Sequence, residues 1–128
     1  MKFLLLIFFS YIFTSLHAQS IDSLIVHAKP GTTVEQFNQL LQTNKYVLVD
    51  FYADWCAPCK KLAPIIQDIS KEYSSTVLVI KVNQDENKPL FDLLQVWELP
   101  TLRIYRNGKI LWSGEGFFPK EVIEEQLK

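Results

Sequence analysis

The chain has 128 residues, which is the size of one domain with a single hydrophobic core and leaves no room for a separate substrate domain. Hydrophobic residues make up 48% of the sequence and charged residues 21%, and the formal net charge is −1. This balance is typical of a globular protein, and it lacks the basic field that attracts nucleic acid. We therefore expect no nucleic-acid partner.

The first 18 residues predict a secretory signal peptide. Lys2 is followed by an apolar run from Phe3 to Leu16 and then by the small residue Ala18. This run is shorter than the roughly 20 residues that a membrane-spanning helix needs, although an uncleaved N-terminal anchor is the alternative. We expect residues 1–18 to be removed and residues 19–128 to form one domain in the periplasm or elsewhere in the cell envelope. The exact cleavage site stays open, because Leu16 departs from the small-residue rule at the third position before the cut.

The first half of this domain alternates between strand and helix patterns. The apolar stretch 24–28, closed by Lys29-Pro30-Gly31, predicts a short strand and a turn. Thr33 can cap a helix whose apolar residues recur at helical spacing, namely Val34, Phe37, Leu40 and Leu41. The β-branched and aromatic run 45–52 predicts a strand that is buried on both faces, and this strand ends at the cysteine motif.

The second half begins with a helix after the cysteines, whose buried face is marked by Leu62, Ile65, Ile66, Ile69 and Tyr73, with a kink expected at Pro64. Residues 76–82 predict another buried strand and residues 88–95 a short helix. Strands at 101–106 and 109–113 form an antiparallel hairpin through Asn107-Gly108, and a last helix covers 119–127. The order β-α-β-α-β-α-β-β-α predicts an α/β fold of three layers, in which helices cover both faces of a mixed central sheet.

The two cysteines, Cys56 and Cys59, stand where a buried strand ends and a helix begins. The loop that they would close is too short to constrain much of the unfolded chain, so a disulfide that serves only to stabilise the fold is a poor explanation for them. Half of a zinc site is also a poor explanation, because there is no second cysteine pair, His17 lies in the signal segment, and we expect His27 at a surface or strand edge. We therefore expect no metal.

Position and spacing give the pair a redox chemistry. Unpaired N–H groups at a helix start favour a negative charge on Cys56, whereas Cys59, one turn further on, should be more enclosed and remain a thiol. One sulfur can then attack a disulfide and the other can resolve the mixed disulfide that results.

The segment VLVDFYADWCAPCK, residues 47–60, resembles the active-site strand and helix start of the thioredoxin family, with Ala57 where most members have Gly. The run 99–101, Leu-Pro-Thr, resembles the cis-proline loop of that family, and Asn107-Gly108 resembles its final hairpin. The similarity extends from Leu24 to Lys128. It implies a thioredoxin-like fold and a protein-disulfide reductase that needs no bound cofactor.

The resemblance also implies a role for each matching residue. Cys56 would be the attacking nucleophile and Cys59 the resolving cysteine, and the two would form a disulfide. Asp50 would accept a proton from Cys59, with Lys81 nearby. The residues implied in substrate binding are Trp55, Ala57 and Pro58 as an apolar rim, and Leu99, Pro100 and Thr101 as a loop with a cis peptide.

Purely structural roles are the alternative for several of these residues. In that case Asp50 is a buried acid whose hydrogen bonds are satisfied, Lys81 is a solvated residue at a strand edge, and Pro100 is an ordinary proline at the start of a strand. We expect Trp97 and Trp112 to be packing or surface aromatics rather than site residues.

The direction of electron flow depends on the reduction potential of the cysteine pair. Ala57-Pro58 places no His or cation between the cysteines, which favours a reductant acting on protein disulfides. The alternatives are a disulfide oxidase or isomerase of the cell envelope, a thiol reductant for cytochrome maturation, and a binding module in which the pair is incidental. A reductant outside the cytoplasm would need a membrane electron donor, and we expect the protein to be a monomer.

Overall fold

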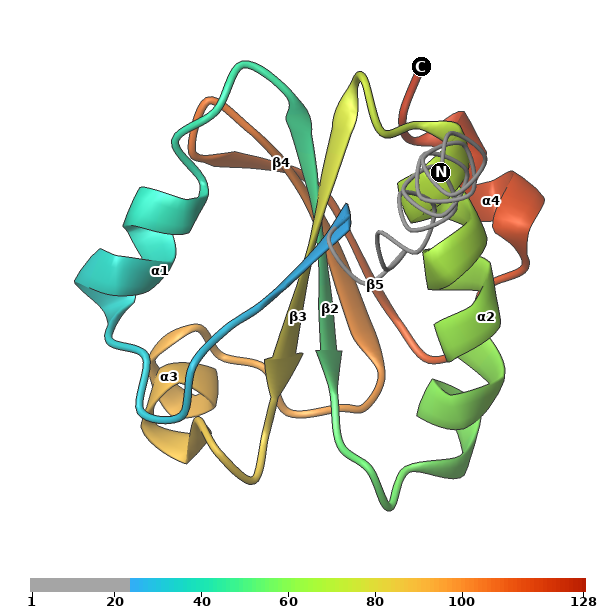
Figure 1. Cartoon of the computed structure of the whole chain (residues 1–128). Helices are drawn as coiled ribbons and strands as arrows, with labels where there is room; N and C mark the ends of the chain where they lie inside the picture. Colours follow the sequence, from blue (N-terminus) through green and yellow to red (C-terminus); the bar gives the residue numbers. More distant parts are fainter. Residues whose placement is uncertain (1–23) are drawn as a thin grey trace, which may run out of the picture.

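The structure is a computed structural model that describes residues 24–128 (Figure 1). The predicted signal segment, residues 1–18, lies outside the described residues. Within the described part, the element order and the type of every element match the sequence prediction: β1 (Ile25–His27), α1 (Val34–Leu40), β2 (Tyr46–Tyr52), α2 (Ala57–Glu72), β3 (Val77–Asn83), α3 (Lys88–Leu93), β4 (Thr101–Arg106), β5 (Lys109–Glu115) and α4 (Lys120–Glu125).

The five strands form one mixed sheet in the order β1-β3-β2-β4-β5. β3 runs parallel to β1 and β2, whereas β4 is antiparallel to β2 and β5 is antiparallel to β4. Asp50 on β2 is paired in register with Lys81 on β3. Because the carboxyl ends of parallel strands share one edge of a sheet, the segments that follow β2 and β3 meet at that edge.

Helices cover both faces of the sheet, α1 and α3 on one side and α2 and α4 on the other (Figure 1). Phe37 and Phe91 pack against Phe51 in the core beneath α1 and α3, and the rings of Phe51 and Phe91 meet edge to face with centroids 5.3 Å apart. Leu48 belongs to the second core, with Leu62 of α2. Side chains alternate along a strand, so Asp50 faces the same side as Leu48, beneath α2. The predicted three-layer arrangement is confirmed.

Local chemistry explains where the elements begin and turn. Thr33 and Gln36 form a capping box at the start of α1. α2 is one helix of 16 residues with Pro64 inside it, and the kink expected at Pro64 stays a prediction. Asn107 and Gly108 both have positive φ, 51° and 75°, which is the backbone that a two-residue hairpin turn requires.

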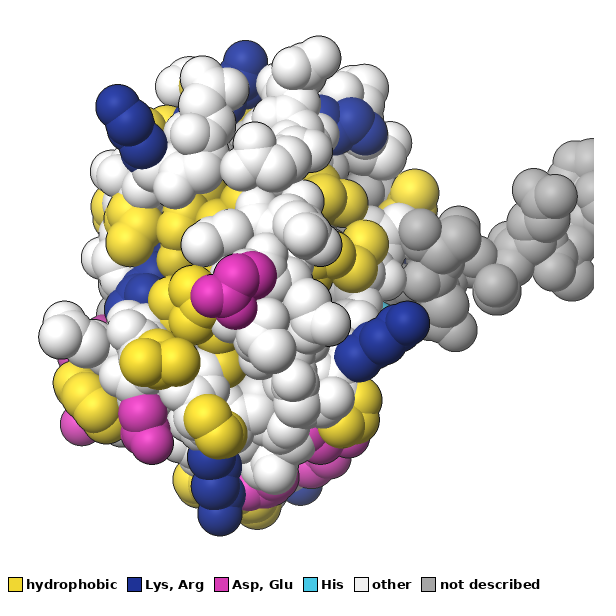
Figure 2. Space-filling model, turned by 90° about the vertical axis from the view of Figure 1, so that its left-hand side faces the viewer, with side chains coloured by type: hydrophobic (Ala, Val, Ile, Leu, Met, Phe, Trp, Pro, Cys, Tyr) yellow, Lys and Arg dark blue, Asp and Glu magenta, His cyan; other side chains and the backbone are white. Residues whose placement is uncertain are grey.

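The outer surface carries charges of both signs, as the small net charge predicts. Figure 2 shows the side covered by α1 and α3, where hydrophobic side chains alternate with polar and charged ones. His27 is exposed on the edge strand β1, as the sequence predicts. No helix among residues 24–128 is long and apolar enough to cross a membrane.

Candidate active site

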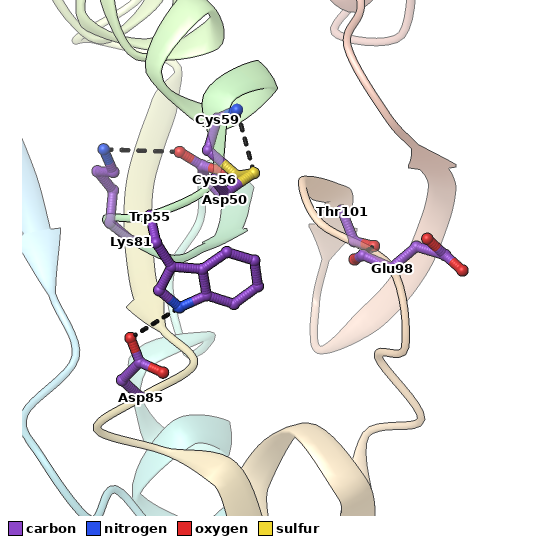
Figure 3. The surroundings of a disulfide bond; sticks show 8 residues. All are labelled: Asp50, Trp55, Cys56, Cys59, Lys81, Asp85, Glu98 and Thr101. Atoms are coloured by element: carbon purple, nitrogen blue, oxygen red, sulfur yellow. Dashed lines mark hydrogen bonds and ion pairs between the residues drawn. A yellow bond between two sulfur atoms is a disulfide. The ribbon is translucent and has the colours of Figure 1, made fainter.

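Cys56 and Cys59 are joined by a disulfide at the start of α2, with their Cα atoms 5.2 Å apart (Figure 3). Cys56 is the N-cap residue, and its sulfur accepts a hydrogen bond from the backbone N–H of Cys59 at 3.3 Å. The backbone N–H of Lys60 is bonded to the Cys56 carbonyl. A helix N–H therefore points at the Cys56 sulfur, and the same group would stabilise a thiolate there.

The two sulfur-bearing residues are equally buried, each 5% exposed, which corrects the expectation that Cys59 is the more enclosed one. They differ instead in the side that each faces. Cys56 lines a surface depression of about 340 Å³, whereas Cys59 lines a second depression of about 380 Å³ together with Tyr52 and Lys81. A burial pattern in the sequence gives only the depth of a residue, so it could not reveal this difference.

Asp50 lies under α2 and is almost completely buried, at 1% exposed. Lys81 Nζ lies 3.7 Å from its Oδ2, and Oδ1 has no hydrogen-bond partner. Burial raises the pKa of Asp50 from 3.8 to about 6, and the nearby Lys81 ammonium offsets part of that rise. An acid with a pKa close to neutrality can both accept and release a proton under physiological conditions.

The depression beside Cys56 brings together most of the predicted rim and loop residues. Trp55 is 65% exposed, and its indole N–H donates a hydrogen bond of 3.1 Å to Asp85. Figure 3 shows Trp55 between Asp85 and the disulfide. The residues around the depression are Trp55, Cys56, Ala57, Pro58, Gln84, Trp97, Glu98 and Leu99.

The loop opposite Cys56 has a cis peptide between Leu99 and Pro100, as the resemblance implies. The Thr101 hydroxyl donates to the Glu98 carbonyl at 2.7 Å, and the Pro100 carbonyl accepts from the N–H of Gly116 at 2.7 Å. Thr101 is 2% exposed, so in this structure its side chain stabilises the loop from inside. Its predicted contact with substrate stays a prediction.

Trp97 is a surface aromatic, as the sequence predicts, but its place beside the cysteines was not predicted. Trp97 is 66% exposed and lines the same depression as Trp55 and Cys56. The spacing of residues gives no signal for this position, because it depends on how the loop before β4 lies against α2. Trp112, by contrast, packs against Phe118 with ring centroids 5.2 Å apart, which confirms its assignment as a packing aromatic.

Other features of the described chain offer less chemistry. A larger depression, of about 470 Å³, lies between the start of α1 and α3, and no cysteine or histidine lines it. Among residues 24–128, no cluster of three or more His, Cys, Asp or Glu side chains could hold a metal ion. The cysteine pair is thus the reactive centre of the part of the chain that the structure describes.

Comparison with known proteins agrees with this geometry. The family model named Thioredoxin matches residues 29–128. Thioredoxin of Buchnera aphidicola subsp. Acyrthosiphon pisum is 42% identical over 89 residues, covering 70% of this chain and 82% of that one. Thioredoxin of Alicyclobacillus acidocaldarius is 37% identical over 95 residues, covering 74% and 90%. A solved mutant thioredoxin from Halobacterium salinarum superposes with a TM-score of 0.71 at 25% identity, covering 80% of this chain and 87% of that one.

Both the family match and these relatives cover most of the chain, and the sheet, the helix start and the cysteine pair are those that the resemblance implied. This chain therefore belongs to the thioredoxin family of protein thiol-disulfide oxidoreductases.

Proposed function

We propose that the protein is an exported disulfide reductase in which Cys56 and Cys59 give two electrons to the disulfides of client proteins. The observation that carries this proposal is the separation of the two cysteines. Cys56 lines a surface depression beside the exposed Trp55 and Trp97, whereas Cys59 lines a different depression whose wall includes Lys81, the partner of Asp50.

The reaction starts from the reduced dithiol. The Cys56 thiolate attacks one sulfur of the client disulfide, and the other client sulfur leaves as a thiolate and takes a proton from water. Cys59 then passes its proton to the Asp50 carboxylate and attacks the Cys56 sulfur. The second client sulfur leaves as a thiolate and is protonated by water, and the Cys56–Cys59 disulfide remains. Asp50 returns its proton to solvent, so two electrons and two protons have moved to the client.

The depression next to Cys56 is the proposed client site. Ala57 and Pro58 are exposed on one side of it and Leu99 lies on the other, so an extended apolar segment fits between them. Trp55 is fixed by Asp85, and Trp97 adds a second exposed ring. Pro100 and Thr101 hold the shape of the facing loop.

The dipeptide between the cysteines supports the reducing direction. Ala57 and Pro58 add no cation or His, so the thiolate of Cys56 is stabilised mainly by the helix start, and a moderately stabilised thiolate corresponds to a reducing couple. A membrane electron donor would regenerate the dithiol outside the cytoplasm, with the protein acting as a monomer. An oxidase, an isomerase and a cytochrome-maturation reductant are the alternatives.

Two measurements test the direction and the clients. We expect the reduction potential of the Cys56/Cys59 couple to lie near the thioredoxin value of about −270 mV. A potential near about −120 mV, as in a strong oxidant, would overturn the reductase proposal. Cys59→Ser should accumulate mixed disulfides with client proteins through Cys56, and Cys56→Ser should accumulate none. Equal capture by both variants would refute the roles assigned to the two cysteines.

Export depends on the first 18 residues. Expression of the full chain in a Gram-negative host should yield a periplasmic protein whose mass corresponds to residues 19–128. A full-length protein in the membrane fraction would instead indicate an anchor, and a full-length cytoplasmic protein would refute export.

A further inference from the structure

The Lys81 ammonium is held by two groups on the neighbouring strand. Its Nζ lies 3.7 Å from Asp50 Oδ2 and 4.3 Å from the centroid of the Tyr52 ring. Asp50 and Tyr52 are two residues apart on β2, so both side chains project from the same face of the sheet. Lys81 is paired in register with Asp50 on β3. The ammonium therefore contacts a carboxylate and the face of an aromatic ring.

The carboxylate alone does not explain where Lys81 rests. At 3.7 Å, the ion pair is longer than a direct hydrogen bond, and a lysine side chain with a choice of rotamers can reach solvent from a half-buried position. The Lys81 side chain is nonetheless only 15% exposed. The attraction between a cation and the face of an aromatic ring explains why the Lys81 ammonium stays largely buried.

We propose that Tyr52 is a positioning residue whose ring holds the Lys81 ammonium against Asp50 in the wall of the depression that Cys59 lines. Tyr52 does not take part in proton transfer itself. Its effect on the reaction rests on the proposed function, in which Asp50 accepts the Cys59 proton. Its effect on the position of Lys81 does not depend on that function.

Other charged groups lie near this cluster and must be kept constant in a test. Asp54 and Lys60 line the same depression, from the segment after β2 and from α2. The pKa of the Tyr52 hydroxyl is raised by burial first and then by the carboxylates of Asp54, Glu86 and Asp50, of which Asp54 follows β2 and Glu86 follows β3. On β4, the residue paired with Asp50 is the uncharged Leu102.

The chain contains a matched control on the same strand. Tyr46, at the other end of β2, is also half-buried, and Arg106 lies over its ring with 4.5 Å from the guanidinium carbon to the centroid. Tyr46→Leu therefore removes a comparable contact between a cation and a ring, far along β2 from Asp50. Tyr52→Phe keeps the ring and removes only the hydroxyl.

The experiment follows the ionisation of Asp50 by carboxyl ¹³C NMR in the oxidised protein from pH 4 to 9. In Tyr52→Leu, the loss of the ring should release Lys81, and the midpoint of the Asp50 titration should move up by roughly 0.5 to 1 pH unit. Tyr52→Phe and Tyr46→Leu should leave the midpoint in place. An unmoved midpoint in Tyr52→Leu overturns the proposal, as does an equal movement in Tyr52→Phe.

A double substitution tests whether Tyr52 acts through Lys81. Lys81→Met alone should raise the Asp50 midpoint at least as much as Tyr52→Leu, and adding Tyr52→Leu to Lys81→Met should cause no further movement. Additive effects of the two substitutions would overturn positioning through Lys81.

Single-turnover rates separate this proposal from the proposed function. The pH at half-maximal rate of insulin reduction should follow the Asp50 midpoint in every variant. If the midpoint of the Asp50 titration moves while the pH profile of the insulin-reduction rate does not, the result supports positioning of Lys81 by Tyr52 and refutes the proton-transfer role of Asp50.

Discussion

Replacing the buried acid with its neutral isostere should stabilise the oxidised protein above neutral pH. Asp50→Asn keeps the shape of the side chain and removes its ionisation. The pKa of Asp50 rises from 3.8 to about 6 on folding, chiefly through burial, and this difference corresponds to about 3 kcal/mol. Because Asp50 is 1% exposed, solvent screening reduces this figure little.

The sign follows from proton binding. The folded state binds the Asp50 proton more tightly than the unfolded state does, so the contribution of Asp50 to the free energy of unfolding should fall as pH rises from about 4 to about 6 and then level off. Asp50→Asn undergoes no such fall. The variant should match the wild type at pH 4 or below and exceed its free energy of unfolding by about 3 kcal/mol at pH 8.

Urea unfolding at pH 4 and at pH 8, followed by tryptophan fluorescence, measures this difference. Asp54→Asn is the matched control, because Asp54 is an exposed acid close to Asp50 in the chain, and it should show no gain at pH 8. A gain in Asp50→Asn of the same size at both pH values, or no gain at pH 8, would refute the desolvation argument.

Three further outcomes are expected. Trp97→Ala should raise the KM for a protein client several-fold with little change in kcat. Leu111 is also an exposed apolar residue, and Leu111→Ala should leave KM unchanged. Unchanged kinetics in both variants would remove Trp97 from the client site. Gly114→Ala should lower the free energy of unfolding in urea by about 1–3 kcal/mol, because an added Cβ would lie 2.6 Å from both the Phe118 and the Trp112 rings. A neutral effect would contradict this and show that both rings move aside. In rapid-quench measurements, the rate at which Cys59 resolves a mixed disulfide should rise as pH increases through about 6, because Asp50 ionises there. A wild-type rate that does not change from pH 5 to 7 would contradict proton transfer from Cys59 to Asp50.

Most of the fold could be predicted because local pattern and tertiary packing agree along this chain. The run 46–52 is apolar on both faces and becomes the central strand β2, and Asn107-Gly108 forms the expected turn. The end of β5 was harder to predict. Gly114 reads as a strand breaker, yet it pairs with Leu102 and β5 continues to Glu115, because backbone pairing does not require a side chain.

The site was predictable where one contiguous motif carried it and less so where separate segments meet. Cys56, Cys59 and Asp50 follow from the strand and the helix start that hold them. The contribution of Trp97 depends on how the loop before β4 lies against α2, and the contact between Tyr52 and Lys81 depends on the register of two strands. Neither arrangement is encoded in the spacing of residues along the chain.

The ladder between β2 and β3 has a consequence for the engineering of this enzyme. Asp50 and Lys81 are attached to adjacent central strands, whereas the dipeptide between the cysteines lies in the exposed first turn of α2. Exchange of Ala57 and Pro58 would change the environment of the sulfurs and leave the paired backbones that carry the acid and the lysine unchanged. We therefore expect substitutions at Ala57 and Pro58 to change the reduction potential while the pairing of Asp50 with Lys81 is kept, which makes the first turn of α2 the natural segment in which to vary electron affinity.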